Sequence, residues 1–167
     1  DIHGEYGNAL QDRAHIFRIN ARQDPKLDEK ELRIPYWALN FDELCEVCFG
    51  EFNNEKDRNL VMERIQLKKE ESLLKYPRPG ISTDTVSADS PVPFSIHDLW
   101  HELYIETFGT YYKGAGVKPT DQLAYEKDSS GNEMKGDPQK GIPPLFKNVK
   151  NEKDDPEKIN YLPNSLN

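Results

Sequence analysis

The segment from Phe94 to Gly109 carries the strongest local signal in the sequence, because a helix start, an apolar face and a helix stop agree with one another. Ser95 with Asp98 three residues later is typical of a capped helix start, and Gly109 stands where a helix ends. One face is apolar at helical spacing: Ile96, Leu99, Trp100, Leu103 and Phe108. We therefore predict a helix over residues 95–108, with Trp100 and Leu103 in the core.

Two further helices are indicated upstream by their capping residues. Asn40 begins a capping box for a helix over residues 41–49, and Gly50 is placed to end that helix. Asn54 is placed to cap a longer helix over residues 55–75, in which most positions are charged. Only a narrow apolar side of this longer helix is available for packing.

Strand signals are few. Residues 15–19 alternate apolar and polar side chains, which is typical of a short half-buried strand. Residues 32–37 are a second candidate, although Pro35 restricts them to an edge strand or an extended segment. Residues 110–167 are rich in Gly and Pro, and a hairpin is expected around residues 129–131. The sequence therefore predicts an α+β fold that is mainly α, with three principal helices, a few short strands and a long irregular C-terminal segment.

The charge balance limits the classes of partner. The 167 residues, about one ordinary domain, include 22 basic and 30 acidic side chains, for a net charge of −8. Lys and Arg are interspersed with Asp and Glu, whereas a protein that binds nucleic acid by itself usually presents a basic patch. No stretch approaches the ~18 apolar residues of a membrane-spanning helix. The chain begins with Asp and not Met, so we expect it to be a piece of a longer protein.

Two pairs of candidate metal ligands are incomplete. Cys45 and Cys48 form a single CxxC within a predicted helix, and no second pair completes a zinc site. We expect both to be buried free thiols in a reducing cytoplasm. His97 and His101 share a helix face but lack the Glu of a zinc-protease motif and an obvious third ligand. We therefore interpret both histidines as polar positions.

Two glycine patterns do not form phosphate loops. Gly131 and Gly136 have the spacing of a Walker A motif, but Asp137 and Pro138 follow where Lys and Ser or Thr are needed. An acidic side chain and a missing backbone amide at these positions would not bind phosphate. Residues 114–116 lack the third glycine of a dinucleotide fingerprint and follow no clear strand.

The N-terminus holds a compact polar cluster. Asp1, His3 and Glu5 place two carboxylates and an imidazole within six residues, around Gly4. Such a cluster can hold a hydrated magnesium ion or orient a water molecule, because hard cations prefer oxygen ligands. On composition alone, an ordinary polar terminus is the alternative interpretation.

The sequence DIHGEYGNAL (residues 1–10) resembles the D-x-H-G-E-Y segment of HerA-type P-loop ATPases, which are hexameric DNA translocases related to FtsK. IPYWALNFDEL (residues 34–44) is similar to the next landmark of that family, and residues 89–94 are similar to its bacterial branch. Distinct motifs cover residues 1–109, which we expect to be a helical central-domain segment of such an ATPase. Residues 110–167 resemble the family only loosely and are expected to be an irregular extension.

The resemblance implies roles for the N-terminal cluster in the full-length protein. Asp1 and Glu5 would be the acidic groups that face the nucleotide–magnesium site, with His3 beside them. Ile2 stands where the family commonly has Pro, which leaves the acidic pair intact. The 167 residues contain no Walker A motif, Walker B acid or identifiable arginine finger, so the resemblance implies an insert between the two Walker motifs. ATP and magnesium are expected in the longer protein, and no cofactor is expected for this fragment, which should be inactive alone.

The longer protein implied by the resemblance is a cytoplasmic ring hexamer that threads duplex DNA. A nuclease or a defence effector is the expected protein partner, and no membrane association is expected. The alternative from a different class is a protein-interaction or structural domain without ATP-linked activity. A metal-dependent hydrolase built on Asp1, His3 and Glu5 is the third interpretation.

Overall fold

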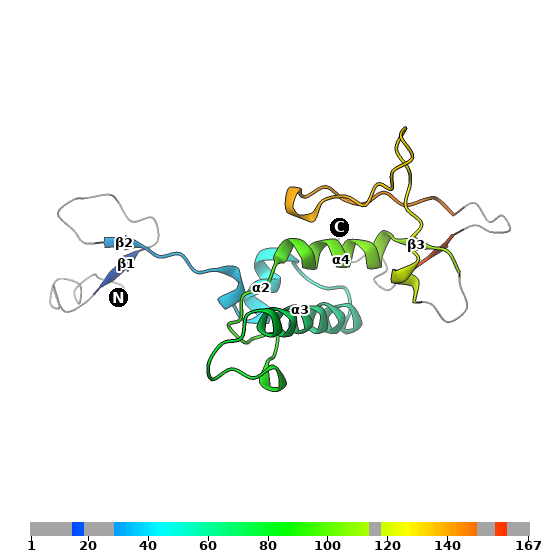
Figure 1. The fold of residues 1–167 in the computed structure, drawn as a ribbon. Coiled ribbons are helices and arrows are strands. Elements are labelled where there is room, and N and C mark those ends of the chain that lie inside the picture. The colour runs from blue at the N-terminus through cyan, green and yellow to red at the C-terminus, as the bar shows by residue number, and fades with distance from the viewer. Residues whose placement is uncertain (1–14, 19–28, 114–117, 150–155, 160–167) are drawn as a thin grey trace. The chain divides into compact units, whose positions relative to one another are not determined.

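The computed structural model describes residues 15–18, 29–113, 118–149 and 156–159 (Figure 1). The chain divides into two compact units, residues 1–36 and residues 37–167.

In the first unit, strand β1 (Ile16–Arg18) pairs in parallel with strand β2 (Glu29–Glu31). Strand β1 confirms the strand predicted over residues 15–19. The second strand prediction, residues 32–37, is wrong in position, because β2 ends at Glu31 and Tyr36–Ala38 form the short 3-10 helix η2. Pro35 accounts for the difference, since it lacks a backbone N–H for a strand ladder and restricts the residue before it.

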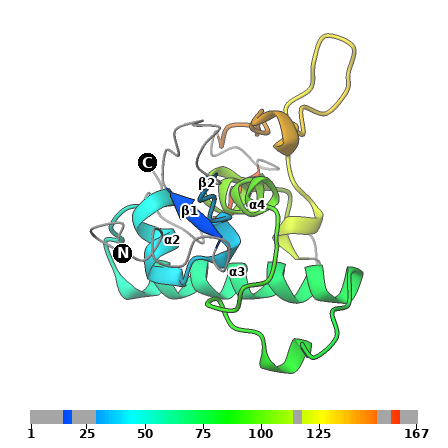
Figure 2. The ribbon, with the colours of Figure 1, turned by 90° about the vertical axis from the view of Figure 1, so that its left-hand side faces the viewer.

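The second unit is built on three helices at the predicted positions: α2 (Phe41–Cys48), α3 (Glu55–Lys75) and α4 (Ile96–Phe108). Each begins at the capping residue that the sequence indicates. At α2 the capping box is complete, because Asn40 Oδ1 accepts from the Glu43 backbone N–H at 2.9 Å and Glu43 Oε2 accepts from the Asn40 N–H at 3.0 Å. Figure 2 shows α2 and α4 on the same side of α3.

The hydrophobic core of this unit takes side chains from all three helices. Its fully or almost fully buried members include Phe41, Leu44, Val61, Ile65, Leu73, Leu99 and Leu103. On α3 the buried positions Val61, Ile65, Lys69 and Leu73 are spaced four residues apart, which confirms the single narrow packing side of this charged helix.

Three details of the predicted core are corrected. Trp100 is half-buried, because it lies on the flank of α4 beside the end of α2 while Leu99, fully buried, occupies the centre of the packed face. Cys45 is buried as predicted, but Cys48, one turn later in α2, is exposed. Phe108, in the last turn of α4, is 46% exposed.

The segment that connects α3 to α4 also joins the helices to one another. It passes through the 3-10 helix η3 (Thr83–Thr85) before it reaches Asp89, whose Oδ1 accepts from the backbone N–H of Phe41 at 2.7 Å and so caps α2. On either side of Asp89, the backbone carbonyls of Ala88 and Ser90 accept hydrogen bonds from Lys69 Nζ of α3. Residues 88–90 therefore hold the start of α2 and the middle of α3 together.

Lys69 is fully buried, which is unusual for a lysine. Its ammonium lies 5.6 Å from the centre of the Phe94 ring, immediately before the cap of α4. Burial lowers the pKa of Lys69, and the nearby carboxylate of Asp89 opposes that shift. The two carbonyl acceptors and the aromatic face replace the water that this ammonium loses on folding.

The rest of the second unit has little regular structure. Strand β3 (Thr110–Tyr111) pairs antiparallel with β4 (Glu157–Lys158), and η4 (Pro119–Asp121) and η5 (Pro138–Lys140) are short 3-10 helices. The turn expected around residues 129–131 is present, with Lys127 bridged to Glu133. Among the described residues no sheet has more than two strands, and the predicted mainly helical α+β fold is confirmed.

Candidate functional site

The three residues predicted to form a site, Asp1, His3 and Glu5, lie outside the described residues. Within the described part of the chain, no group of three or more His, Cys, Asp or Glu side chains is placed to hold a metal ion. None of the helices in that part is long and apolar enough to cross a membrane.

One of the two histidines of α4, His101, contacts the C-terminal loops. His101 Nε2 lies 3.2 Å from the backbone carbonyl of Lys135, and His97, one turn earlier, is exposed. Between them, Asp98 Oδ1 accepts a hydrogen bond from the Gln139 side chain at 3.3 Å. These contacts fasten the loops that carry Lys135 and Gln139 to α4.

This arrangement predicts that chelation leaves the protein's stability unchanged. Replacing His97 or His101 with Ala is expected to change the free energy of unfolding by about 0.5 kcal/mol or less, because each removes at most one exposed polar contact. Thermal unfolding of both variants, with and without a chelator, measures the effect. A loss of stability on chelation that either substitution abolishes would show that these histidines bind a metal.

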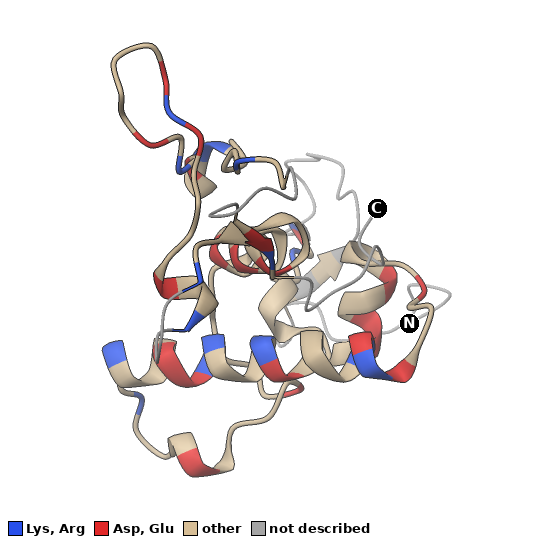
Figure 3. Cartoon of the chain, turned by 90° about the vertical axis from the view of Figure 1, so that its right-hand side faces the viewer, with Lys and Arg blue, Asp and Glu red and all other residues tan. Residues whose placement is uncertain are grey.

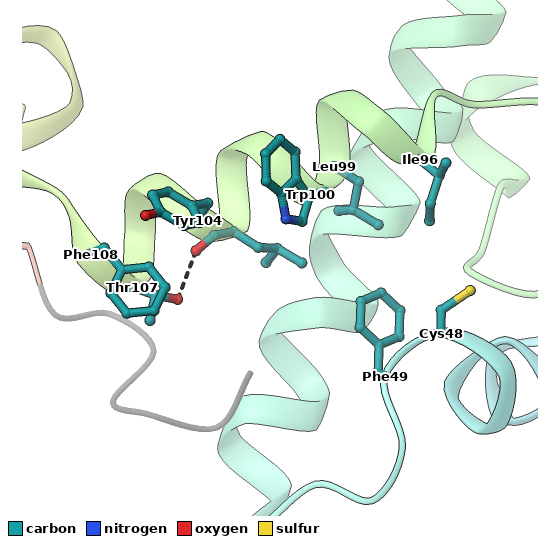
Figure 4. Close-up of a pocket in the computed structure, with 9 residues that line it drawn as sticks. Cys48, Phe49, Ile96, Leu99, Trp100, Tyr104, Thr107 and Phe108 are labelled. Carbon is teal, nitrogen blue, oxygen red and sulfur yellow. Dashed lines mark hydrogen bonds between the residues drawn. The ribbon is translucent and has the colours of Figure 1, made fainter. Parts of the chain in front are cut away.

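A groove lies between the end of α2 and the face of α4 (Figure 4). The cavity has a volume of about 290 Å³. It is lined by Cys48, Phe49, Ile96, Leu99, Trp100, Leu103, Tyr104, Thr107 and Phe108. Figure 4 shows Cys48 and Phe49 across the groove from α4. We call this feature the α4 groove.

Aromatic rings at intervals of four residues form one side of the α4 groove. The ring centres of Trp100 and Tyr104 lie 5.8 Å apart, and those of Tyr104 and Phe108 lie 4.7 Å apart. Thr107 is the one Ser or Thr among the lining residues. Its hydroxyl donates a hydrogen bond to the backbone carbonyl of Leu103 at 2.7 Å, so this hydroxyl already has a partner within the helix. The groove surface is therefore mainly apolar and aromatic.

The opposite flank of α4 is polar and faces α3. Arg64 Nε and Nη2 each lie 2.8 Å from Glu106 Oε1, and Lys68 of α3 forms ion pairs with Glu102 of α4 and with Glu71 of its own helix. Burial alone would lower the pKa of Lys68, but the hydrogen bonds to Glu102 and Glu71 raise it above its ordinary value. The basic groups nearest to α4 are thus already paired with carboxylates.

A family model for the central domain of helicase HerA matches residues 1–165. The chain belongs to the HerA helicase central-domain family. This membership relates it to HerA-type DNA helicases and translocases, whose ATPases use ATP and magnesium. The family match covers nearly the whole chain, including the C-terminal part that the sequence motifs cover only loosely. A search of curated proteins finds no match to this chain.

The glycines with Walker A spacing have a different role in this member of the HerA family. Gly131 and Gly136 both have positive φ, 86° and 71°, and lie in turns of the C-terminal loops. A Cβ at Gly136 would lie 2.4 Å from the backbone oxygen of Ile142, so only glycine fits there. The structure thus gives both glycines a role in loop geometry.

The α4 groove is the feature that the sequence did not reveal. Its signal is present as the aromatic residues Trp100, Tyr104 and Phe108 at four-residue spacing, but this spacing equally describes a buried helix face. In the structure Leu99 and Leu103 are almost fully buried beneath the groove that they help to line, whereas the aromatic row remains partly exposed along it.

Proposed function

We propose that this chain acts within an ATP-driven DNA translocase of the HerA type, as a mainly helical accessory insert between the Walker motifs. The observation that carries the proposal is the pair of motifs DIHGEY and IPYW at this spacing, in a chain that belongs to the HerA central-domain family. In this proposal residues 1–109 are the ATPase segment and residues 110–167 are an extension.

The proposal assigns Asp1 and Glu5 to the nucleotide–magnesium site of the complete enzyme, with His3 beside them. The donor set fits this assignment, because carboxylate oxygens are the ligands that magnesium prefers and can also orient its bound water. Magnesium bound there would neutralise charge on the transferred phosphoryl group. Asp1 and Glu5 would hold the hydrated ion by their oxygens, and His3 would donate or accept a hydrogen bond at that water shell.

The proposal also assigns DNA contacts to the assembled ring and not to this segment alone. Its net charge of −8 opposes the neutralisation of phosphates on which DNA affinity depends. We propose that the complete protein is a homohexamer that encloses duplex DNA in the cytoplasm, with a nuclease or defence effector as its protein partner.

The first test is ATP turnover. We expect the 167-residue chain alone to show no hydrolysis above background, because no residues of the chain match a phosphate loop. In the proposed complete enzyme, Glu5→Gln should lower kcat by about tenfold or more, since it removes a charge at the site of phosphoryl transfer. Steady-state phosphate release measures both effects.

The matched control is Glu63→Gln on α3, whose carboxylate is 65% exposed and should be neutral for turnover. Turnover by the 167-residue chain alone that disappears in Glu5→Gln would contradict the proposal and favour an independent metal-dependent hydrolase. An unchanged kcat for Glu5→Gln in an active complete enzyme would contradict the assignment of Glu5.

A further inference from the structure

We propose that the α4 groove binds a basic amphipathic helix of a partner protein. The α4 helix that forms its long wall has 13 residues, so the groove extends over about 20 Å at 1.5 Å per residue. That length accommodates about three turns of a bound helix, which is the usual span of apolar anchors in recognition of a helix by a groove. This inference does not depend on the proposed ATPase function.

One exposed apolar side chain lines the groove, and another is adjacent in sequence to a lining residue. Phe108 lines one end and is 46% exposed, and Val47, next to the lining residue Cys48, is 72% exposed. Trp100 and Tyr104 also line the groove and are half-buried aromatic residues, a class that often dominates binding energy at interfaces. Clustered apolar exposure of this kind is typical of a docking surface.

The acidic charge beside the short wall of the groove determines the chemistry of the occupant. The stretch from Phe41 to Glu55, which forms α2 and the short wall, contains no Lys or Arg and five acidic residues: Asp42, Glu43, Glu46, Glu51 and Glu55. The α4 helix also contains no Lys or Arg, but its Glu102 and Glu106 are paired with Lys68 and Arg64 on the opposite flank, so they add no free charge to the groove. Figure 3 shows basic residues interspersed with acidic ones along α3.

Glu46 and Glu51 have carboxylates available to a partner. Both residues are exposed, flank the lining residues Cys48 and Phe49 in sequence, and form no ion pair with another described residue. Lys or Arg beside the apolar anchors of a bound helix would complement this charge. A nucleic acid or an anionic membrane would be repelled, and a second copy of this chain would bring an acidic wall against an acidic wall.

The experiment uses the full 167-residue chain and synthetic helical peptides of about 15 residues. One peptide has Leu anchors at helical spacing with Lys at the other positions, a second keeps the Leu anchors with Glu replacing Lys, and a third keeps Lys with Ser replacing Leu. Calorimetric titration measures affinity. Emission of Trp100 reports the location, in a Trp37→Phe background that leaves Trp100 as the sole tryptophan.

We expect saturable binding of the Leu/Lys peptide alone, with a shift of Trp100 emission. Phe108→Ser should weaken it by about tenfold, since it removes an anchor ring at the groove. The matched control, Leu74→Ser, replaces a residue that is 72% exposed on α3 and does not line the groove, and should leave affinity unchanged. The double variant Glu46→Gln, Glu51→Gln should weaken binding and reduce its dependence on salt.

Each other outcome overturns the proposal. If the Leu/Glu peptide bound as tightly as the Leu/Lys peptide, charge would have no role in recognition. If the Lys/Ser peptide bound as tightly as the Leu/Lys peptide, the attraction would be electrostatic and non-specific. Absence of binding, or binding that Phe108→Ser does not weaken, would exclude the groove. Self-association of the chain that is lost in Phe108→Ser would assign the groove to a second copy.

Discussion

Replacing Lys69 with Met is expected to lower the free energy of unfolding by about 2–3 kcal/mol, because the backbone carbonyl of Ala88 loses its buried donor. The carbonyl of Ser90 also loses this bond, although it keeps a second one from the Val92 N–H at 2.7 Å. The contact of the ammonium with the Phe94 ring is lost as well. Methionine has nearly the same length, so the change reports the polar contacts and not a cavity.

Chemical denaturation of the wild type and the variant measures this effect. Lys56→Met, at an exposed position in the first turn of the same helix, is the matched control and should have an effect within about 0.5 kcal/mol. Equal stability of the Lys69 and Lys56 variants would show that residues 88–90 do not depend on α3 for their position.

The difference in unfolding free energy between the wild type and Lys69→Met is expected to depend on pH. Because burial lowers the pKa of Lys69 in the folded state, the unfolded chain binds this proton more tightly. Stability due to Lys69 should therefore rise with pH between its lowered folded-state pKa and the ordinary lysine value of 10.5. The difference between wild type and Lys69→Met should widen in this interval, and a difference that narrows there would contradict the assignment.

Leu99→Ala is expected to lower the free energy of unfolding by about 3 kcal/mol or more, through lost apolar burial plus the cavity left behind. Leu99 is 0% exposed at the centre of the helical core, where its neighbours can relax only partly. Against a total stability of about 5–15 kcal/mol for a typical domain, this loss should also lower the Tm markedly. Equilibrium denaturation, with thermal unfolding as a second measurement, tests it.

Trp100→Ala is the informative comparison, because Trp100 is larger but only half-buried. We expect it to cost about 1–2 kcal/mol, less than Leu99→Ala, since Trp100 is only partly buried at the groove. Leu74→Ala, at a position that is 72% exposed, is the neutral control. A larger effect for Trp100→Ala than for Leu99→Ala would mean that the groove is closed in solution.

The two sets of variants separate fold from recognition. Lys69 and Leu99 are interior groups, so their replacement should affect folding first and any binding only as a consequence. Phe108, Glu46 and Glu51 are exposed, so their replacement should alter peptide binding while the protein remains folded. A variant in the second set that unfolds the protein would argue against the α4 groove as a free docking surface.

The sequence by itself determined the helices, because their signals are local. Asn40, Asn54 and Ser95 each accept a hydrogen bond from a backbone N–H three residues later, and a cap of this kind depends only on neighbouring residues. The family was also visible in the sequence, because its motifs are short and continuous. The roles of Asp1, His3 and Glu5 remain predictions from resemblance.

Only the tertiary structure decided which apolar side chains are buried and which groups the Lys69 ammonium contacts. Helical spacing places Trp100 and Leu99 near one face, but the packing of α2 and α3 against α4 leaves Trp100 partly exposed at the groove and Leu99 fully buried. Likewise, Lys69 belongs to a charged run that is typical of a solvated helix face. Only the return of residues 88–90 across α3 supplies the acceptors that replace the water lost by its ammonium, and those acceptors lie 19 and 21 residues away in the chain.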